Sequence, residues 1–93
     1  MYYVYILRSI AYPKQTYIGY TCDLRARLAQ HNAGRSFHTS KFAPRALASY
    51  IALPEESLAT LLEKYLKSGS GHAFAKRHLL TRDAVKRRGG IAG

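Results

Sequence analysis

The sequence predicts an α+β fold, with a small three-stranded, mainly antiparallel sheet flanked by helices in the order β-β-α-β-α-α. Two observations indicate this fold. Two short stretches rich in aromatic and β-branched residues lie close enough near the start of the chain to form a hairpin, and helical periodicity dominates the later segments. At 93 residues, without an internal repeat or a linker, the chain is expected to form a single domain over residues 1–82.

The first two strands are expected in "YYVYIL" (residues 2–7) and "TYIGY" (residues 16–20), whose composition is typical of buried strands. Because side chains alternate along a strand, one register of this hairpin places Tyr5 beside Tyr17. Glycine weakens a strand interior. Gly19, on the same face as Tyr17, therefore suggests that another backbone or a ligand approaches the sheet closely there.

The first helix is expected in "TCDLRARLAQHNAG" (residues 21–34). Thr21 is expected to cap this helix, Asp23 to place its negative charge in the first turn, and Gly34 to end it. The two strands and this helix together account for the first third of the chain.

An arginine and a histidine interrupt the apolar stripe of this helix. At 3.6 residues per turn, Arg27 and His31 lie one turn apart on the face that carries the leucines and should pack on the sheet. Taken singly, Arg27 can lie at the edge with its head in water, and His31 can be a hydrogen-bonded boundary residue. Taken together, both side chains would point toward the sheet face of Tyr5 and Tyr17, which indicates a polar site.

A third strand, two helices and a tail are expected in the remainder of the chain. The strand is "ALASYIAL" (residues 46–53), and the clearest helix is "PEESLATLLEKYLK" (residues 54–67). The apolar stripe of this helix is expected to comprise Leu58, Leu61, Leu62, Tyr65 and Leu66. "SGSG" is expected to break the helix, a short last helix to cover residues 72–81, and the basic tail, residues 83–93, to be flexible.

Glu63 stands at the flank of this stripe, in a chain with only five acidic residues. On this helix alone, the favoured interpretation is a solvated pair between Glu63 and Lys67 at the i, i+4 spacing. The alternative is a metal-binding carboxylate. A single carboxylate can suffice for Mg²⁺, which keeps several waters and takes other oxygens from a substrate phosphate.

The charge of the chain restricts its partners. Fifteen Lys and Arg against five Asp and Glu give a net charge of +10, which favours nucleic acid or an anionic membrane surface. No apolar run is long enough to span a bilayer, and the apolar face of the clearest helix is expected to pack on the sheet, so we expect no membrane partner and a cytoplasmic location. With Cys22 as the single cysteine, an intrachain disulfide and a thiolate-based zinc site are excluded.

Five of these residues together resemble the GIY-YIG nuclease superfamily, and in particular its small stand-alone bacterial members. "YVY" (residues 3–5) is similar to the first motif, with Tyr and Val where many members have Gly and Ile, and "YIG" (residues 17–19) matches the second. Arg27, His31 and Glu63 follow in the order that the family shows. The asparagine that some members carry after the acidic helix has no counterpart after Glu63.

The resemblance implies an endonuclease that hydrolyses phosphodiester bonds, with DNA as the expected substrate and Mg²⁺ or Mn²⁺ as the expected cofactor. It implies that Glu63 holds the metal ion and that Arg27 stabilises the charge on the phosphate. Tyr5 would act on the attacking water while Tyr17 orients it. Because a tyrosine of pKa about 10 is a poor base at neutral pH, Tyr5 needs either a lowered pKa or a proton relay, for which His31 is the candidate.

Three basic residues on the loop after the first helix, His38, Lys41 and Arg45, are expected to contact flanking phosphates, although a solvated loop explains each of them equally well. Gly19 and Lys67 complete the set of candidate nucleic-acid-binding residues. The small surface favours recognition of nucleic-acid structure or of phosphates over a long base sequence. The alternative function is a non-catalytic DNA- or RNA-binding module on the same fold. A homodimer would allow both strands to be cut, and the family suggests DNA repair or recombination.

Overall fold

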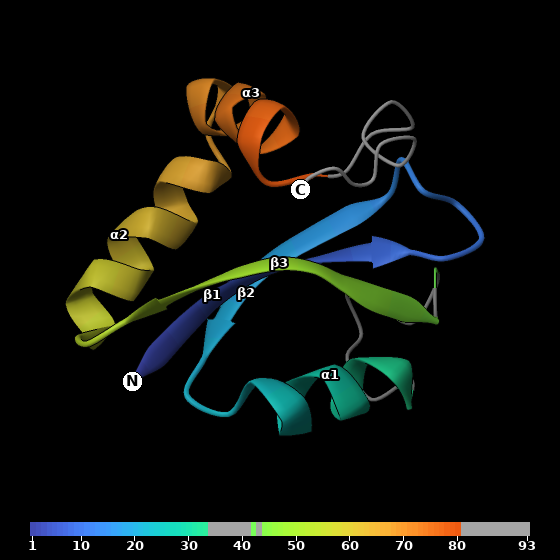
Figure 1. Cartoon of the computed structure of the whole chain (residues 1–93), viewed down its shortest axis with the longest axis horizontal. Helices are drawn as coiled ribbons and strands as arrows, with labels where there is room; N and C mark the ends of the chain where they lie inside the picture. The colour runs from blue at the N-terminus through green and yellow to red at the C-terminus, as the bar shows by residue number, and fades with distance from the viewer. Residues whose placement is uncertain (34–41, 43, 81–93) are drawn as a thin grey trace, which may run out of the picture.

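The structure, a computed structural model, describes residues 1–33, 42 and 44–80 of the chain (Figure 1). Its elements are β1 (Tyr2–Ser9), β2 (Thr16–Thr21), α1 (Leu24–Asn32), β3 (Arg45–Leu53), α2 (Glu56–Leu66) and α3 (Gly69–His78). The order is β-β-α-β-α-α, so the α+β fold predicted from the sequence is confirmed. The tail that we expected to be flexible lies outside the described residues.

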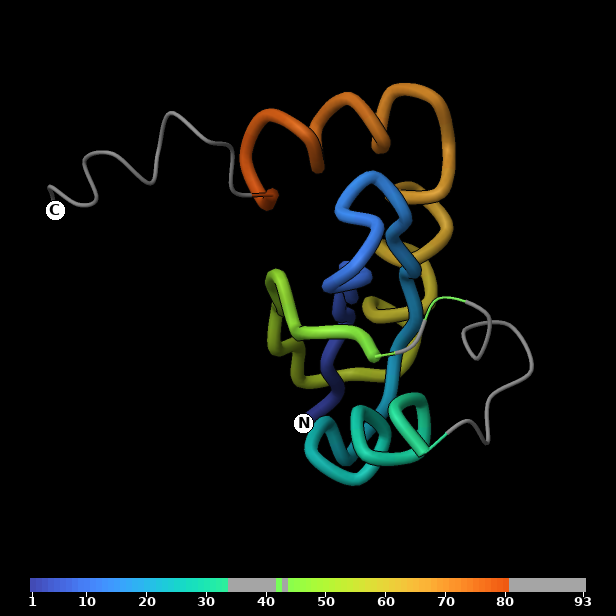
Figure 2. The backbone as a smooth tube through the Cα atoms, turned by 90° about the vertical axis from the view of Figure 1, so that its right-hand side faces the viewer, coloured from blue at the N-terminus to red at the C-terminus, as the bar shows by residue number. Residues whose placement is uncertain are grey.

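The three strands form one antiparallel sheet in the order β2-β1-β3. Figure 2 shows α1 against one face of this sheet, with α2 and α3 against the other. Since β1 is central and covered on both faces, its residues from Val4 to Leu7 are all buried. The register pairs Tyr5 with Gly19 and Leu7 with Tyr17, which makes Tyr5 and Tyr17 diagonal neighbours on the face toward α1.

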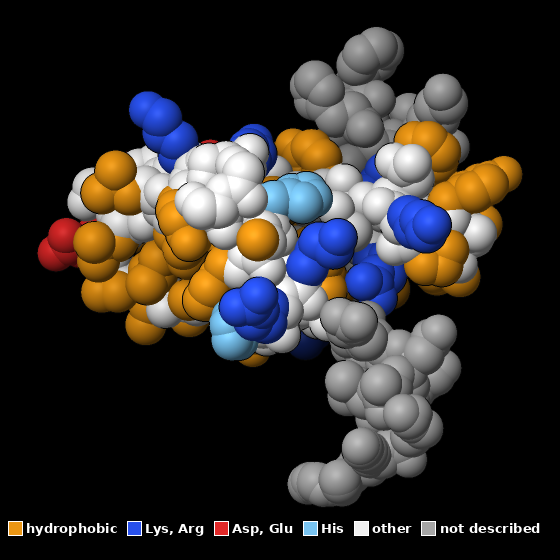
Figure 3. Space-filling model, turned by 90° about the horizontal axis from the view of Figure 1, so that it is seen from above, with side chains coloured by type: hydrophobic (Ala, Val, Ile, Leu, Met, Phe, Trp, Pro, Cys, Tyr) orange, Lys and Arg blue, Asp and Glu red, His pale blue; other side chains and the backbone are white. Residues whose placement is uncertain are grey.

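The hydrophobic core lies between the sheet and the two later helices. It consists of Val4, Ile6, Ile18, Ala59, Leu66 and Ala75. The expected stripe of α2 is therefore partly wrong, because Leu58, Leu61 and Tyr65 are largely exposed. The face of α2 that packs on the core includes Ala59 and, of the expected stripe, only Leu62 and Leu66. Figure 3 shows hydrophobic side chains gathered at the α2 end of this side of the molecule.

The start of α1 differs from the sequence prediction. Asp23, and not Thr21, is the N-cap, since its carboxylate accepts a hydrogen bond from the backbone N–H of Ala26 at 3.1 Å. Thr21 ends β2, and its hydroxyl accepts from the backbone N–H of Asp23 at 3.0 Å. Asp23 takes the N-cap position because Thr21 is still paired within the β-sheet. At its other end the helix stops at Asn32, and the expected terminator Gly34 lies outside the described residues.

The last helix begins three residues earlier than predicted and ends at His78. Ser68 caps it by accepting a hydrogen bond from the backbone N–H of Gly71 at 3.2 Å, so the "SGSG" segment ends α2 and also starts α3. A Cβ atom at Gly71 would lie 1.7 Å from the carbonyl oxygen of Tyr65. Glycine at 71 therefore allows the two helices to meet at a tight corner. None of the described helices is long and apolar enough to cross a membrane.

Candidate active site

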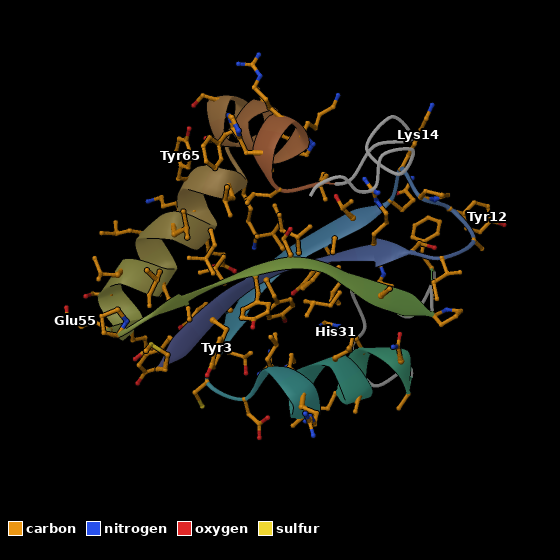
Figure 4. The ribbon with its side chains drawn as sticks, in the orientation of Figure 1. Tyr3, Tyr12, Lys14, His31, Glu55 and Tyr65 are labelled. Carbon is orange, nitrogen blue, oxygen red and sulfur yellow. The ribbon has the colours of Figure 1, made fainter. Side chains whose placement is uncertain are left out.

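A hydrogen bond joins β1 to α1 at the centre of the predicted site. The Tyr5 hydroxyl lies 3.0 Å from His31 Nε2, and the two residues are only 1% and 2% exposed. Figure 4 shows the His31 side chain pointing from α1 to the sheet. The expectation that the polar stripe of the first helix faces the strand tyrosines is therefore confirmed.

Tyr17 completes an aromatic cluster, by which we mean Tyr5, Tyr17 and His31. Its ring centroid lies 6.4 Å from that of Tyr5 and 5.1 Å from that of His31. Unlike the other two members, Tyr17 is half-buried because it stands on β2, an edge strand of the sheet. The cluster is therefore covered at Tyr5 and open to solvent at Tyr17.

Gly19 is required by the cluster itself. A Cβ atom at this position would lie 2.7 Å from the Tyr5 hydroxyl oxygen, 2.9 Å from its Cζ and 3.1 Å from Cε2 of Tyr17. The close approach to the sheet that we inferred from this glycine is real, but the tyrosine side chains fill the space. Gly19 thus acts by admitting Tyr5 and offers no room for a nucleic-acid group directly above it.

The electrostatic environment sets the protonation of the central pair. Burial raises the pKa of Tyr5, with a further contribution from Tyr17, and the nearby Arg27 guanidinium opposes this effect. Burial also lowers the pKa of His31, as do the positive charges of Arg27 and Arg45. At neutral pH the hydroxyl is therefore protonated and the imidazole neutral, and the hydroxyl donates to Nε2 in the tautomer that carries its proton on Nδ1. Of the two routes that we considered for Tyr5, a lowered pKa is wrong for this structure and a relay through His31 fits it.

Arg27 lies half-buried on the inner face of α1. It lines a hollow of about 350 Å³ at the β2 edge, together with Tyr2, Tyr20, Thr21, Cys22 and Glu56. The Tyr20 hydroxyl donates to Glu56 at 3.0 Å, which links β2 to α2 across this hollow. A guanidinium with one side toward Tyr5 and the other toward an open hollow can meet a phosphate that enters from solvent.

Glu63 lies on α2 and forms an ion pair with Lys67, whose Nζ is 3.1 Å from its carboxylate. The solvated i, i+4 pair expected from the helix alone is therefore present. The Glu63 side chain is nevertheless only 22% exposed, and its charge contributes to the raised pKa values of Tyr5 and, after the larger effect of Glu56, of Tyr20. Glu63 thus stands within electrostatic reach of the aromatic cluster without a direct contact to it.

A second hollow, of about 270 Å³, lies along the same strand edge. It is lined by Thr16, Tyr17, Ile18, Lys67 and His72. The predicted residue Lys67 is thereby brought to the open side of Tyr17. His72 and Glu56 were not predicted, because each is a polar residue in the first turn of its helix and shows no conflict with the periodicity. Only the packing of α2 and α3 beside β2 reveals them.

The remaining predicted contacts do not line these two hollows. Arg45 is not in a solvated loop, as one of our interpretations held, but begins β3 and is 4% exposed. The side chain of Asn32, at the end of α1, binds both backbone polar groups of Arg45 and so fixes the start of the strand. His38 and Lys41 lie outside the described residues.

The described residues include no group of three or more His, Cys, Asp or Glu side chains placed to hold a metal ion. Glu63 is thus a single carboxylate within electrostatic reach of Tyr5. Such a donor set fits Mg²⁺ or Mn²⁺ bound between one carboxylate, waters and phosphate oxygens, and does not fit a metal enclosed by protein ligands alone.

Comparison with known proteins covers most of the chain. Residues 1–77 match the GIY-YIG catalytic domain family. The structure-specific endonuclease subunit SLX1 of Candida dubliniensis is 36% identical over 85 residues, covering 84% of this chain and 28% of that protein. A UPF0213 protein of Streptococcus pyogenes serotype M3 is 29% identical over 86 residues, covering 91% of each chain. The chain thus spans about a quarter of the SLX1 subunit but nearly all of the UPF0213 protein.

Proposed function

This chain belongs to the GIY-YIG catalytic domain family, and on that premise we propose that it is a metal-dependent endonuclease that hydrolyses phosphodiester bonds in DNA. The observation that supports the proposal best is the buried hydrogen bond between Tyr5 and His31, with Arg27 beside it. A nucleic-acid-binding surface does not require a buried tyrosine hydrogen-bonded to a neutral imidazole. A tyrosine that acts as a general base does require such a partner, because it must pass on its proton.

The proton relay uses both members of this pair. Tyr5 accepts a proton from the attacking water as its own hydroxyl proton passes to His31 Nε2. The resulting hydroxide attacks the phosphorus, the bond to the leaving oxygen breaks, and that oxygen takes a proton from solvent. Tyr5 is neutral before and after the transfer, so its raised pKa does not prevent the step. The imidazole takes up the positive charge.

Arg27 and Tyr17 act on the phosphate and the water. Negative charge grows on the phosphate oxygens as the water attacks, and a guanidinium held beside Tyr5 stabilises that charge. The half-buried Tyr17 hydroxyl orients the water or the phosphate from the open side of the cluster. Both roles need groups that are in place before the substrate arrives, and packing on α1 and β2 provides this.

Glu63 is the residue that would hold Mg²⁺ or Mn²⁺. The ion would supply positive charge against the scissile phosphate. In the structure the Lys67 ammonium group is paired with the Glu63 carboxylate, and the Lys67 side chain is half-exposed. Exchange of partners would release Lys67 into the hollow beside Tyr17, where it can bind a phosphate of the same nucleic acid.

The substrate is proposed to be DNA recognised by its structure or its phosphates. The two hollows follow the β2 edge and present Arg27, Lys67 and His72, which suits a phosphate backbone and provides few contacts for reading bases. The SLX1 relatives are named structure-specific endonuclease subunits, which supports the same class of substrate. A cytoplasmic location, a role in DNA repair or recombination, and a homodimer that cuts both strands are parts of this proposal.

A second candidate function is a non-catalytic nucleic-acid-binding module on the same fold. The observation that favours it is the ion pair of Glu63 with Lys67, which already satisfies the carboxylate. The two functions differ in their response to the loss of Glu63. Removal of this acid should abolish cutting in an enzyme, whereas in a binder of net charge +10 it should leave binding equal or stronger.

The proposal is tested with a panel of labelled duplex, nicked, flap, branched and single-stranded DNAs in Mg²⁺, Mn²⁺ or EDTA. Wild type is compared with Arg27→Ala and with the control Arg25→Ala, which alters an exposed arginine of the same helix. Metal-dependent cutting that Arg27→Ala abolishes and Arg25→Ala preserves supports the enzyme and identifies its substrate. Binding without cutting by all three proteins supports the binding module.

A further inference from the structure

Arg45 is a buried cation that the catalytic scheme does not use. Its side chain is 4% exposed, and its Nε and Nη1 atoms make no hydrogen bond with any residue in the described part of the chain. Burial lowers its pKa from a normal value so high that the guanidinium stays charged at neutral pH. Because a buried charge without an ion-pair partner opposes folding, and none is found among the described residues, an arginine here is difficult to explain by stability alone.

The position of Arg45 is fixed by its surroundings. Asn32 Oδ1 accepts a hydrogen bond from the Arg45 backbone N–H at 2.6 Å, and Asn32 Nδ2 donates to the Arg45 carbonyl oxygen at 2.9 Å. The Phe42 ring lies 5.7 Å from the guanidinium carbon. The backbone is therefore secured and one face of the guanidinium is covered, while two of its nitrogen atoms keep free donors.

The guanidinium is close to the proposed active site. Arg45 pairs with Ser9 of β1, on the sheet face that also carries Tyr5. Asn32, which holds Arg45, directly follows His31 in the sequence. The positive charge of Arg45 contributes to the lowered pKa of His31, and Tyr17 in turn counteracts the effect of burial on Arg45. Two cationic side chains, Arg27 and Arg45, therefore act on the aromatic cluster.

We propose that Arg45 forms an anion subsite next to the aromatic cluster, which binds a phosphate group of the nucleic acid adjacent to the phosphate that is cut. The proposal rests on the endonuclease function. Buried guanidinium donors form strong hydrogen bonds to phosphate oxygens, and a phosphate would neutralise a charge that has no ion-pair partner among the described residues. Arg45 therefore binds and positions the substrate, while Arg27 acts on the reacting phosphate.

The subsite also couples phosphate binding to His31. While the guanidinium is unpaired, its charge favours the neutral imidazole. A phosphate on Arg45 cancels that charge, so the pKa of His31 should rise when the subsite is filled. A more basic His31 accepts the Tyr5 proton more readily, and substrate binding thereby prepares the relay.

The test measures phosphate binding without any cleavage. Inorganic phosphate is titrated into the full chain at pH 7.5, and the His31 ring and Arg45 Nε–H signals are followed by NMR. Wild type is compared with Arg45→Met, Arg45→Lys and the control Arg25→Met, an exposed arginine of α1. We expect saturable binding that weakens at least tenfold in Arg45→Met, is unchanged in Arg25→Met and is partly kept in Arg45→Lys.

Two further readouts separate a binding role from a structural one. The urea midpoint of Arg45→Met should equal or exceed that of wild type, because the substitution removes a buried charge that has no ion-pair partner among the described residues. The pKa of His31 should be higher in free Arg45→Met than in free wild type, and phosphate should raise it in wild type and in Arg25→Met but not in Arg45→Met. If Arg45→Met unfolds, Arg45→Lys provides the same comparison with the charge retained.

The proposal is overturned if wild type shows no saturable phosphate binding, or if Arg45→Met binds phosphate as tightly as wild type does. A large loss of stability in Arg45→Met, with normal phosphate binding in Arg45→Lys, would also overturn it in favour of a structural arginine. Failure of these tests leaves the endonuclease proposal intact. Failure of wild type to cut DNA would refute the endonuclease without changing the phosphate titration.

Discussion

The Tyr5 hydroxyl and the His31 imidazole, 26 positions apart in the chain, form a buried hydrogen bond 3.0 Å long between β1 and α1. The bond depends on Gly19, which leaves room for the tyrosine, and on the packing of α1, which turns the histidine inward. Because burial makes the tyrosine less acidic and the histidine less basic, the proton rests on the tyrosine until a substrate is bound.

Tyr5→Phe should remove the relay while keeping the ring. We expect cleavage to fall by about 10²–10⁴, the usual contribution of a general base. We also expect the free energy of unfolding to fall by about 1–3 kcal/mol, because His31 Nε2 is left buried without its hydroxyl partner. Single-turnover cleavage and urea unfolding measure the two effects.

The matched control for this variant is Tyr12→Phe, since Tyr12 is 60% exposed. It should change neither cleavage nor unfolding by more than the spread of surface substitutions, about 0.5 kcal/mol. Equal cleavage rates for Tyr5→Phe and wild type would show that the Tyr5 hydroxyl takes no part in the reaction.

Gly19→Ala should destabilise the protein, because the added methyl group would lie 2.7 Å from the Tyr5 hydroxyl oxygen. We expect a loss of about 1–3 kcal/mol, which is typical of overpacking, together with reduced cleavage. Gly69→Ala is the control, since a Cβ atom there meets nothing within 4 Å. It should be neutral or stabilising by up to about 1 kcal/mol. Chemical denaturation of both variants measures these changes in stability. Similar midpoints for Gly19→Ala and Gly69→Ala would contradict the close contact at Gly19.

Stability should decrease as the pH falls below the normal histidine pKa of 6.5. In this range the unfolded chain binds a proton at His31, whereas the folded chain does not, because its pKa is lowered by burial and by Arg27 and Arg45. The unfolded state therefore gains stability until the pH reaches the lowered pKa of the folded state. Urea unfolding of wild type and His31→Asn from pH 7.5 to 5 measures this effect. An identical pH dependence in the two proteins would refute it.

Asn32→Ala should destabilise the chain, because the Asn32 side chain holds both backbone groups of Arg45. Loss of these bonds leaves a buried strand end unsatisfied and should cost about 1–3 kcal/mol. Gln30→Ala, at an exposed position of the same helix, should have little effect. Hydrogen exchange of the Arg45 amide provides a local measurement. An amide that exchanges equally slowly in Asn32→Ala and wild type would contradict the role of this clamp.

The fold and the centre of the candidate site could be predicted from local patterns in the sequence. Alternation along the first two strands places Tyr5 and Tyr17 on one face, and the helical period turns Arg27 and His31 toward it. Both arguments concern neighbours within one element or one hairpin. The polar residues could be recognised because they replace leucines on a face that must be buried.

Features that depend on packing between distant elements could not be predicted. Arg45 follows a proline in a polar stretch, and its burial results from Asn32 and the start of β3. Leu58 and Leu61 fit the helical period of α2 well, yet both are exposed, because the face that packs on the core is centred on Ala59 and Leu66. Glu56 and His72 reach the β2 edge through the placement of α2 and α3, which no local pattern encodes.

The central claim is that Glu63 holds a metal ion for cleavage. It is tested most directly by the single-turnover rate of DNA cleavage in Mg²⁺ for Glu63→Gln, beside Glu55→Gln, whose side chain makes no cap hydrogen bond at the start of the same helix. We expect Glu63→Gln to lose at least about 100-fold in rate while still binding DNA, and Glu55→Gln to match wild type. A Glu63→Gln protein that cuts DNA at the wild-type rate with the same Mg²⁺ dependence would contradict the account.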